Sequence, residues 1–274
     1  MSYRRFVLIS HLRSGTHMVR TALDSHPAVV CQGEPFNANS PRLPYSLETS
    51  VEQILSHWVF PQDLPSEIKM AGFVLHLYHP GSLKAFPYLK KNERWNSIWT
   101  ILSRDPELSV VFLSRRNLLL RHLSQVLARS TGFWHSWRGD MVHRTTHLES
   151  PPPKDFVDTD RPRVPKQHLD LQRLLTDFEE IRDLQSRARQ LFSHQRCHYL
   201  VYEDLCAAPD KAFQELQQFL GVPQMPISPA TRRLENRLLS EAVSNYDEIR
   251  EGLSGTEWSS FLHETSPQDR TPKI

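Results

Sequence analysis

The chain has 274 residues, of which 39% are hydrophobic and 23% are charged, so it is long enough for one large α/β domain or two small ones. A formal net charge of +2 excludes the strong overall basic field that is typical of nucleic-acid-binding proteins. The 3 cysteines show neither a disulfide framework nor metal-ligand spacing, and they suit a reducing, cytoplasmic compartment. No apolar run is long enough for a signal-peptide core or a membrane span.

The first elements read as strand, loop and helix. Phe6 to Ile9 is a short apolar run that predicts a buried strand. A polar loop follows at 11–17, and the apolar residues from Met18 to Leu23 then recur on one helical face until Pro27 ends the helix. A second short strand is expected at 28–31, and it leads directly into Gly-Glu-Pro-Phe at 33–36.

Further strands and helices alternate along the middle of the chain. Residues 49–58 have helical spacing, and 71–77 and 109–113 read as strands. The second of these strands runs into Ser114-Arg115-Arg116 and a helix that extends to about Arg129. Residues 151–165 are rich in proline and charge, which predicts an irregular loop within the domain.

The last third of the chain resumes the alternation. An amphipathic helix is expected over 166–193, a strand over 198–202, and a helix from Pro209 to Gly221. Strands that alternate with helices predict an α/β three-layer sandwich with a central parallel sheet and a P-loop-like strand–loop–helix at its start. We expect residues 1–274 to form a single domain.

The loop after the first strand is a candidate anion site. Ligands of open parallel sheets bind beyond the carboxyl ends of the strands, and the N–H groups at a helix N-terminus favour an anion. Gly15 would let a phosphate approach the backbone, and Arg13, Ser14 and Thr16 add hydrogen-bond donors. The alternative is a plain turn in which Thr16 only caps the helix.

The same loop departs from the Walker pattern of kinases and NTPases. That pattern needs a glycine at each end and a lysine before Ser or Thr, whereas residues 1–60 contain no lysine and Arg13 precedes the single glycine of the loop. The strand at 109–113 is followed by Ser114 and Arg115, with no aspartate to hold magnesium. These departures disfavour a P-loop-like nucleotide kinase, which remains an alternative.

A second candidate anion site follows the strand at 109–113. Arg115 and Arg116 come at its carboxyl end, and Ser124 lies eight positions after Arg116 in the next helix. Arginine suits the geometry of phosphate, although both arginines could equally be solvent-facing residues after a core strand. Two anion sites at the ends of two parallel strands suit a nucleoside with phosphates at both ends.

These residues resemble the sulfotransferase family. Its first motif is a Lys/Arg-Ser-Gly-Thr loop between strand and helix, and its second is a strand, Arg-Asn, and a serine eight residues past the arginine; residues 13–16 match the first, and Arg116, Asn117 and Ser124 match the second. Further similar segments lie in family order between Phe6 and Trp258. They are 33–36, 129–134, 202–205, 219–222, 245–249 and 252–255, of which 129–134 and 245–249 are similar to the bacterial carbohydrate branch.

The resemblance implies 3′-phosphoadenosine 5′-phosphosulfate (PAPS) as the sulfuryl donor and the 3′,5′-bisphosphate PAP as the product. It implies that Arg13, Ser14, Gly15, Thr16 and the adjacent His17 hold the 5′-phosphosulfate. It assigns the 3′-phosphate to Arg116 and Ser124, with Arg250 as a further candidate. The cytosolic branch has Lys-Thr-His where this chain reads Val74-Leu75-His76, so that branch's lysine is missing.

The expected mechanism is in-line transfer that depends on positioning and electrostatics, by analogy with phosphoryl transfer. Arg13 would stabilise the charge on the leaving phosphate, and a base must take the proton of the acceptor hydroxyl. Glu34 is the first candidate base, because it follows the second strand, and His76 is the second. Each could instead be structural, Glu34 in a turn and His76 in the core. We expect no metal site.

The acceptor is expected to be a hydroxyl, possible classes being a carbohydrate or a glycolipid. Trp95, Trp99, Trp134 and Trp137 fall between the cofactor strands, where indole rings could stack on a sugar or simply pack in the core. Besides the kinase, a second alternative is a degenerate fold that binds nucleotide or a partner protein without turnover.

Overall fold

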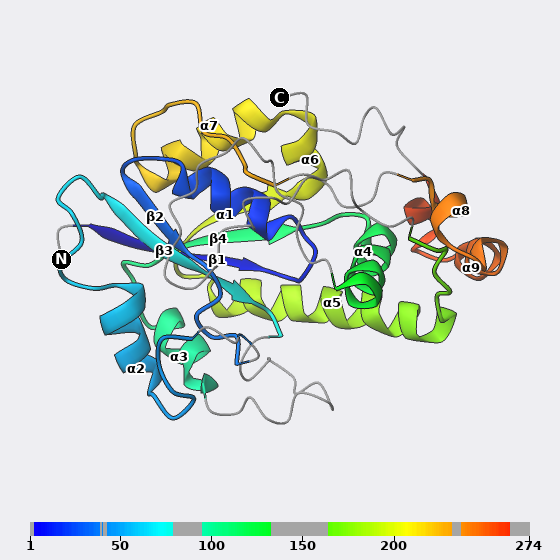
Figure 1. The fold of residues 1–274 in the computed structure, drawn as a ribbon, viewed down its shortest axis with the longest axis horizontal. Coiled ribbons are helices and arrows are strands. Elements are labelled where there is room, and N and C mark those ends of the chain that lie inside the picture. The colour runs from blue at the N-terminus through cyan, green and yellow to red at the C-terminus, as the bar shows by residue number, and fades with distance from the viewer. Residues whose placement is uncertain are drawn as a thin grey trace.

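The structure is a computed structural model, and it describes residues 3–38, 40, 43–78, 95–132, 164–231 and 237–263. Within these residues, five strands form one parallel sheet in the order β2-β3-β1-β4-β5 (Figure 1). The strands are β1 (Arg4–Ser10), β2 (Val29–Gln32), β3 (Met70–His76), β4 (Ser109–Ser114) and β5 (Arg196–Val201). β1 is therefore the central strand, and every buried run expected to be a strand is one.

Helices connect the strands and cover both faces of the sheet. The helices of the described residues are α1 (Thr16–Asp24), α2 (Val51–Ile54), η1 (Leu55–Val59), α3 (Ser97–Ser103), α4 (Leu118–Thr131), α5 (Leu171–Leu191), α6 (Tyr202–Ala207), α7 (Pro209–Leu220), α8 (Leu239–Ala242), α9 (Tyr246–Leu253) and η4 (Ser259–Leu262). In Figure 1, α1, α6 and α7 lie above the sheet, and α2, α3 and α5 lie below it. The predicted α/β three-layer sandwich is confirmed.

Alternation along β1 divides the core into two layers. Phe6 and Leu8 pack with side chains of α1, α6 and α7 on one face of the sheet, whereas Val7 and Ile9 pack with those of α2, α3 and α5 on the other. Successive side chains of a strand point to opposite faces, so a strand that is apolar at every position must be covered on both sides. Packing on both faces therefore holds β1 in position, and with it the start of the loop that follows.

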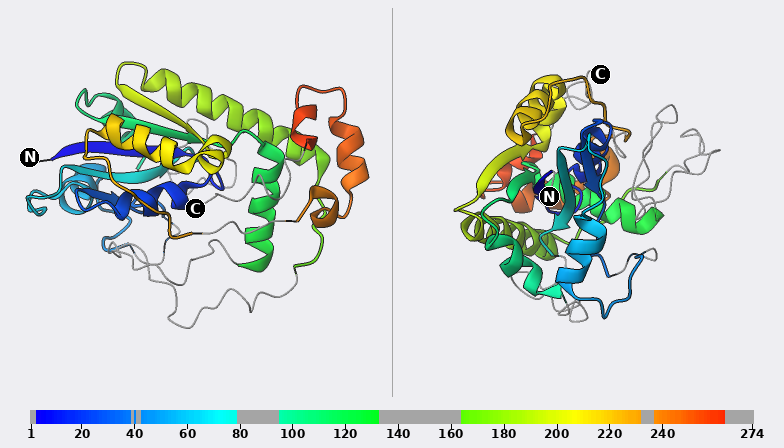
Figure 2. Two further views of the ribbon diagram at one scale, coloured as in Figure 1. Left: turned by 90° about the horizontal axis from the view of Figure 1, so that it is seen from above. Right: turned by 90° about the vertical axis from the view of Figure 1, so that its left-hand side faces the viewer.

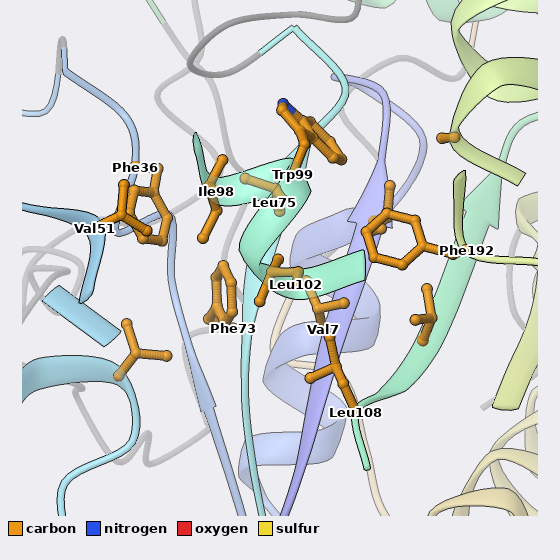
Figure 3. Close-up of a cluster of buried hydrophobic side chains, with 14 of the residues drawn as sticks. Val7, Phe36, Val51, Phe73, Leu75, Ile98, Trp99, Leu102, Leu108 and Phe192 are labelled. Atoms are coloured by element: carbon orange, nitrogen blue, oxygen red, sulfur yellow. The ribbon is translucent and has the colours of Figure 1, made fainter. Parts of the chain in front are cut away.

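The layer that contains α3 is rich in aromatic rings (Figure 3). Phe192, the residue directly after α5, lies edge-on to Trp99, with ring centroids 6.3 Å apart, and Trp95 packs edge-on to Phe36 at 5.8 Å. Trp95 and Trp99 are both buried, so they are core residues and not sugar platforms. Trp134 and Trp137 lie outside the described residues.

A third apolar cluster lies beyond the carboxyl ends of the strands. It joins α4 and the first half of α5 to α8, α9 and η4, which Figure 2 shows gathered at one end of the molecule. In the part of the chain that the structure describes, no helix is both long and apolar enough to cross a membrane. The expected irregular loop at 151–165 lies outside the described residues except for its last two, and the single domain stays a prediction.

Some element boundaries differ from expectation. The helix expected at 49–58 is one α-turn followed by the π-helical turn η1. The helix expected from 166 begins at Leu171, because Asp170 caps it by accepting a hydrogen bond from the Arg173 N–H at 2.8 Å. The strand expected to include Tyr202 ends at Val201, and a short helix, α6, follows with two acidic residues in its first turn, where the helix dipole favours them.

Candidate active site

The loop between β1 and α1 has a backbone that only particular residues allow. Arg13 and Gly15 both adopt positive φ angles, of 65° and 91°. A Cβ atom at Gly15 would lie 2.4 Å from Cδ2 of Tyr202, so the Tyr202 ring excludes any side chain there. Ser14 and Thr16 are buried, and the N-terminus of α1 begins directly after Gly15, which presents N–H groups suited to an anion.

Three contacts link this loop to β4, α4 and α6. The Arg13 Nε donates to the Ser124 hydroxyl at 3.0 Å, so residues of the two predicted anion sites touch. Arg115 donates to the Arg13 carbonyl oxygen at 3.2 Å and lies 4.9 Å from the centre of the Tyr202 ring. Arg115, which the sequence left as a possible solvent-facing residue, is therefore buried beside the loop.

The arginines near the loop give it a strongly positive environment. Burial, followed by the charge of Arg115, lowers the pKa of Arg13 to about 10, and burial likewise lowers the pKa of Arg121 to about 10. Within the described residues, the buried Nε atoms of Arg115 and Arg121 have no hydrogen-bond partner. A group of buried cations with donor capacity left over is the chemistry that a phosphate or sulfate ligand complements, so these residues fit a phosphorylated donor.

Arg121 belongs to a buried polar network that sequence reasoning missed. It forms an ion pair with Asp177 of α5, donates to the Gln125 side chain at 2.5 Å, and contacts His11 Nδ1 at 3.2 Å. His122 adds a 2.7 Å contact to the same carboxylate. In the sequence, this network is indicated by the position of Arg121 among the leucines at the start of α4. Ser124 and Gln125 follow three and four positions later, which places them on the same face of the helix.

Glu34 and His76 meet at the carboxyl edge of the sheet. The His76 Nε2 lies 2.9 Å from the Glu34 Oε1, and the second carboxylate oxygen accepts a hydrogen bond from Asn37 at 2.9 Å. Ser10 and His76 are register partners at the ends of β1 and β3, which places this pair directly beside the loop after β1. The structure therefore brings both candidate bases together.

Two further side chains surround this pair. His17 of α1 has its Nε2 atom 3.9 Å from Glu34 Oε1. The Tyr78 ring stacks on the His76 ring, with centroids 5.6 Å apart and planes 15° from parallel. Burial, followed by the charge of Glu34, raises the pKa of Tyr78 well above its usual value, so its hydroxyl stays protonated. No motif or spacing in the sequence singles out Tyr78.

Two predicted phosphate ligands are paired with carboxylates at the surface. The Arg116 guanidinium contacts both carboxylate oxygens of Asp204 at 2.9 Å, and its side chain is 61% exposed. Arg250 pairs with Asp247 at 2.8 Å on the exposed side of α9. Exposed pairs of this kind hold together weakly, so both arginines stay available to a stronger anion and both assignments stay predictions.

Comparison with known proteins adds to this geometry. Nodulation protein H of Rhizobium tropici is 24% identical over 266 residues, which covers 94% of this chain and 92% of that protein. Nodulation protein H of Rhizobium meliloti is 25% identical over 265 residues, with coverages of 94% and 95%. The crystal structure of a sulfotransferase from Alicyclobacillus acidocaldarius aligns over 97% of this chain and 98% of that chain, with 13% identity and a TM-score of 0.43.

The sequence model of the sulfotransferase family matches residues 6–226. This range contains β1 from Phe6 onward, the other four strands of the sheet, the loop after β1, and the Glu34–His76 pair. The chain therefore belongs to the sulfotransferase family.

Proposed function

We propose that this chain transfers a sulfuryl group from PAPS to the hydroxyl of an acceptor, a carbohydrate or a glycolipid. The observation that carries the proposal is the placement of two different groups at one edge of the sheet. The basic loop around Arg13 follows β1, and the Glu34–His76 pair stands at the end of neighbouring β3, joined to β1 through the Ser10 side chain at 3.1 Å. Family membership supports the same reaction class.

The residues of the loop suit the 5′ end of the donor. The backbone N–H groups at the start of α1, with Arg13, Ser14, Thr16 and His17 around them, would bind its phosphosulfate. When bound, PAPS supplies the sulfuryl group and leaves as PAP. The positive charge of Arg13 stabilises negative charge that develops beside it, and a buried cation acts more strongly than one in water.

Residues of α4 and of the segment between β4 and α4 suit the 3′ end of the donor. Ser124 faces the loop through its contact with Arg13, and Arg116 stands where β4 ends. Arg250 of α9 is a third candidate. Together these groups would distinguish a 3′-phosphorylated nucleotide from ADP, because the extra phosphate needs its own donors.

The Glu34–His76 pair suits the acceptor end of the reaction. A base must take the proton of the attacking hydroxyl, and a well-placed base contributes roughly 10²–10⁴-fold in rate. A carboxylate that receives hydrogen bonds from His76 and Asn37 is held in one orientation, which is what positional catalysis needs.

A transfer assay with sulfur-labelled PAPS tests this proposal. The full chain is incubated with panels of oligosaccharides and glycolipids, and labelled product is separated from donor. We expect label on at least one hydroxyl-bearing acceptor, and a loss of about 10²-fold or more in turnover for Glu34→Gln, with PAP affinity within about twofold. The matched control is Glu52→Gln on exposed α2. Full activity of the Glu34→Gln enzyme would exclude Glu34 as the base.

A further inference from the structure

An unbroken chain of hydrogen bonds runs from the loop after β1 to Glu34. The Thr16 and Ser10 hydroxyl oxygens are 2.8 Å apart, the Ser10 hydroxyl lies 3.1 Å from His76 Nδ1, and His76 Nε2 lies 2.9 Å from Glu34 Oε1. Thr16 is the first residue of α1. The chain therefore connects the proposed donor-binding loop with the candidate base.

The chemistry of the partners sets the direction of this chain. An ionised carboxylate can only accept, so His76 Nε2 carries the proton that it donates to Glu34. In the neutral ring, Nδ1 is then an acceptor for the Ser10 hydroxyl, which in turn accepts from Thr16. The Ser10 carbonyl oxygen lies farther from Nδ1, at 3.3 Å, than the Ser10 hydroxyl does at 3.1 Å, which favours the hydroxyl as the partner of Nδ1.

Burial separates the roles of the two candidate bases. The His76 side chain is 2% exposed, whereas that of Glu34 is 18% exposed. The Tyr78 ring covers one face of the His76 ring, and both ring nitrogens are engaged. An acceptor hydroxyl can therefore approach the carboxylate more readily than the imidazole.

We propose that His76 is a positioning residue, held by Ser10 in the Nε2–H tautomer, that orients the Glu34 carboxylate as the base. This inference rests on the proposed function for its kinetic part, but the hydrogen-bond arrangement stands independently. The proposal selects one of the two candidate bases: the Glu34 carboxylate takes the proton of the acceptor hydroxyl, and the His76 imidazole does not. It also ties the base to Thr16, so that the base and the donor loop are held in one fixed geometry.

The tautomer is tested first, by NMR of imidazole nitrogens in the full chain without substrate. The His76 signals are assigned by their loss in His76→Gln. We expect the neutral ring to carry its proton at Nε2. In Ser10→Ala this preference should weaken but persist, because Nδ1 has lost its donor while Glu34 still accepts from Nε2. A neutral ring protonated at Nδ1 would overturn the proposal.

Kinetics of two His76 variants test the positioning role. The amide of glutamine reaches the place of Nε2 and can still donate to Glu34, whereas that of asparagine reaches only the place of Nδ1. We expect His76→Gln to keep kcat within about tenfold and His76→Asn to lose about 10²-fold, with KM for donor unchanged in both. His57→Gln, at an exposed histidine of η1, is the control for a histidine-to-amide change.

The pH profile provides a readout that a merely structural role would not move. Glu34 is faced by His17 from α1, His76 from β3 and Tyr78 after β3. In His76→Asn the ionised carboxylate has lost a donor, so the acid limb of kcat should move to higher pH, while in His76→Gln it should stay in place. Equal losses of kcat in the two variants, large or small, would show that donation to Glu34 is not what His76 contributes, and would overturn the proposal.

Failure of the proposed function gives a different pattern. If the wild-type chain transfers no sulfuryl group and does not bind PAP, the function is wrong, whatever the variants do. The tautomer measurement still decides the Ser10–His76–Glu34 arrangement in that case, because it needs neither donor nor acceptor.

Discussion

Gly15 shows how a single residue can set the shape of the loop after β1, the proposed donor loop. Its φ of 91° is a conformation that residues with a side chain rarely adopt, and the Tyr202 ring lies where a Cβ atom would stand. Strain and steric overlap therefore act together at this position. The sequence could predict that a glycine belongs here for close approach to phosphate, but not that Tyr202 from a distant segment fills the space behind it.

Substitution of this glycine separates those two effects. We expect Gly15→Ala to weaken PAP binding by more than about tenfold and to destabilise the fold by more than the roughly 1–2 kcal/mol of left-handed strain. Gly132→Ala is the matched control, because Gly132 has a φ of 74° and, apart from its chain neighbours, no atom of the described residues lies within 4 Å of the added Cβ. Equal effects of the two changes in calorimetry and urea unfolding would contradict the account.

Arg116 is one of the two predicted phosphate ligands that the structure shows paired with a carboxylate. Its pairing with Asp204 is exposed, and such pairs contribute no more than about 1 kcal/mol. Asp204→Asn should therefore tighten PAP binding by up to about fivefold, because Arg116 no longer has to break an ion pair before it binds the phosphate. ADP affinity should stay constant. Unchanged PAP affinity in Asp204→Asn, together with equal losses for PAP and ADP in Arg116→Ala, would remove Arg116 from the 3′-phosphate site.

At the scale of elements, α4 is the helix that joins the donor loop to the rest of the fold. Asn117 caps it by accepting from the Leu120 N–H at 2.9 Å, and Glu203 accepts from the backbone N–H groups of Arg116 and Asn117. Ser124 receives Arg13, and Arg121 connects α4 to α5 through Asp177. The position of α4 therefore controls both ends of the proposed donor site.

The Arg121–Asp177 ion pair should dominate the stability of this junction. Asp177→Asn leaves the fully buried Arg121 without its counter-charge, and we expect a loss of about 3–5 kcal/mol in the free energy of unfolding. Asp183→Asn breaks a half-exposed pair on the same helix and should cost less than about 1 kcal/mol. Urea unfolding compares them, and similar losses would contradict the buried-pair argument.

The elements that sequence reasoning predicted well are those whose pattern is carried by apolar residues. The strands around Leu8, Val74 and Val111 are continuous apolar runs, which only burial on both faces explains. α6 was missed because six residues are too few to show helical periodicity. The Arg121–Asp177 pair was missed because its members are far apart in sequence, and only the fold brings α4 and α5 together.

The candidate site was predictable to a similar extent. Arg13, Gly15 and Glu34 could be proposed from motifs, since the motifs lie where strands end. The contact between Arg13 and Ser124, and the chain from Thr16 to His76, depend on the register of β1 with β3 and on the packing of α4, which no local pattern encodes. Positions of strand ends can be inferred from sequence, whereas the directions of polar side chains come from tertiary packing.

For the whole molecule, buried charge makes stability depend on pH. Burial, followed by the charge of Arg121, lowers the pKa of His11 to about 3, against about 6.5 in an unfolded chain. The unfolded state therefore binds the proton first, so stability falls as pH falls below about 6.5 and levels off near 3. Burial alone would raise the pKa of Asp177, but the hydrogen bond from His122 and the charge of Arg121 together lower it by more, so the net pKa is lowered. Protonation of this carboxylate therefore adds to the loss of stability at low pH.

The contribution of His11 can be isolated by substitution. We expect it to account for about 2 kcal/mol of the stability lost between pH 7 and pH 5. In His11→Asn the amide keeps a partner for Arg121 but does not titrate, so the same change in pH should cost correspondingly less. Urea unfolding at the two pH values measures the difference. An identical pH dependence in both proteins would show that His11 is not buried in its neutral form.

The most direct test of the central claim is calorimetric titration of the full chain with PAP, with ADP and magnesium-ATP as comparison ligands. The proposed 5′-phosphosulfate and 3′-phosphate sites, at the ends of β1 and β4, predict that PAP binds tightly without magnesium, and that ADP binds much more weakly because it lacks the 3′-phosphate. Preference for magnesium-ATP would contradict the donor assignment and indicate a kinase. Absence of binding to all three nucleotides would contradict it as well and indicate a fold that has lost its donor site.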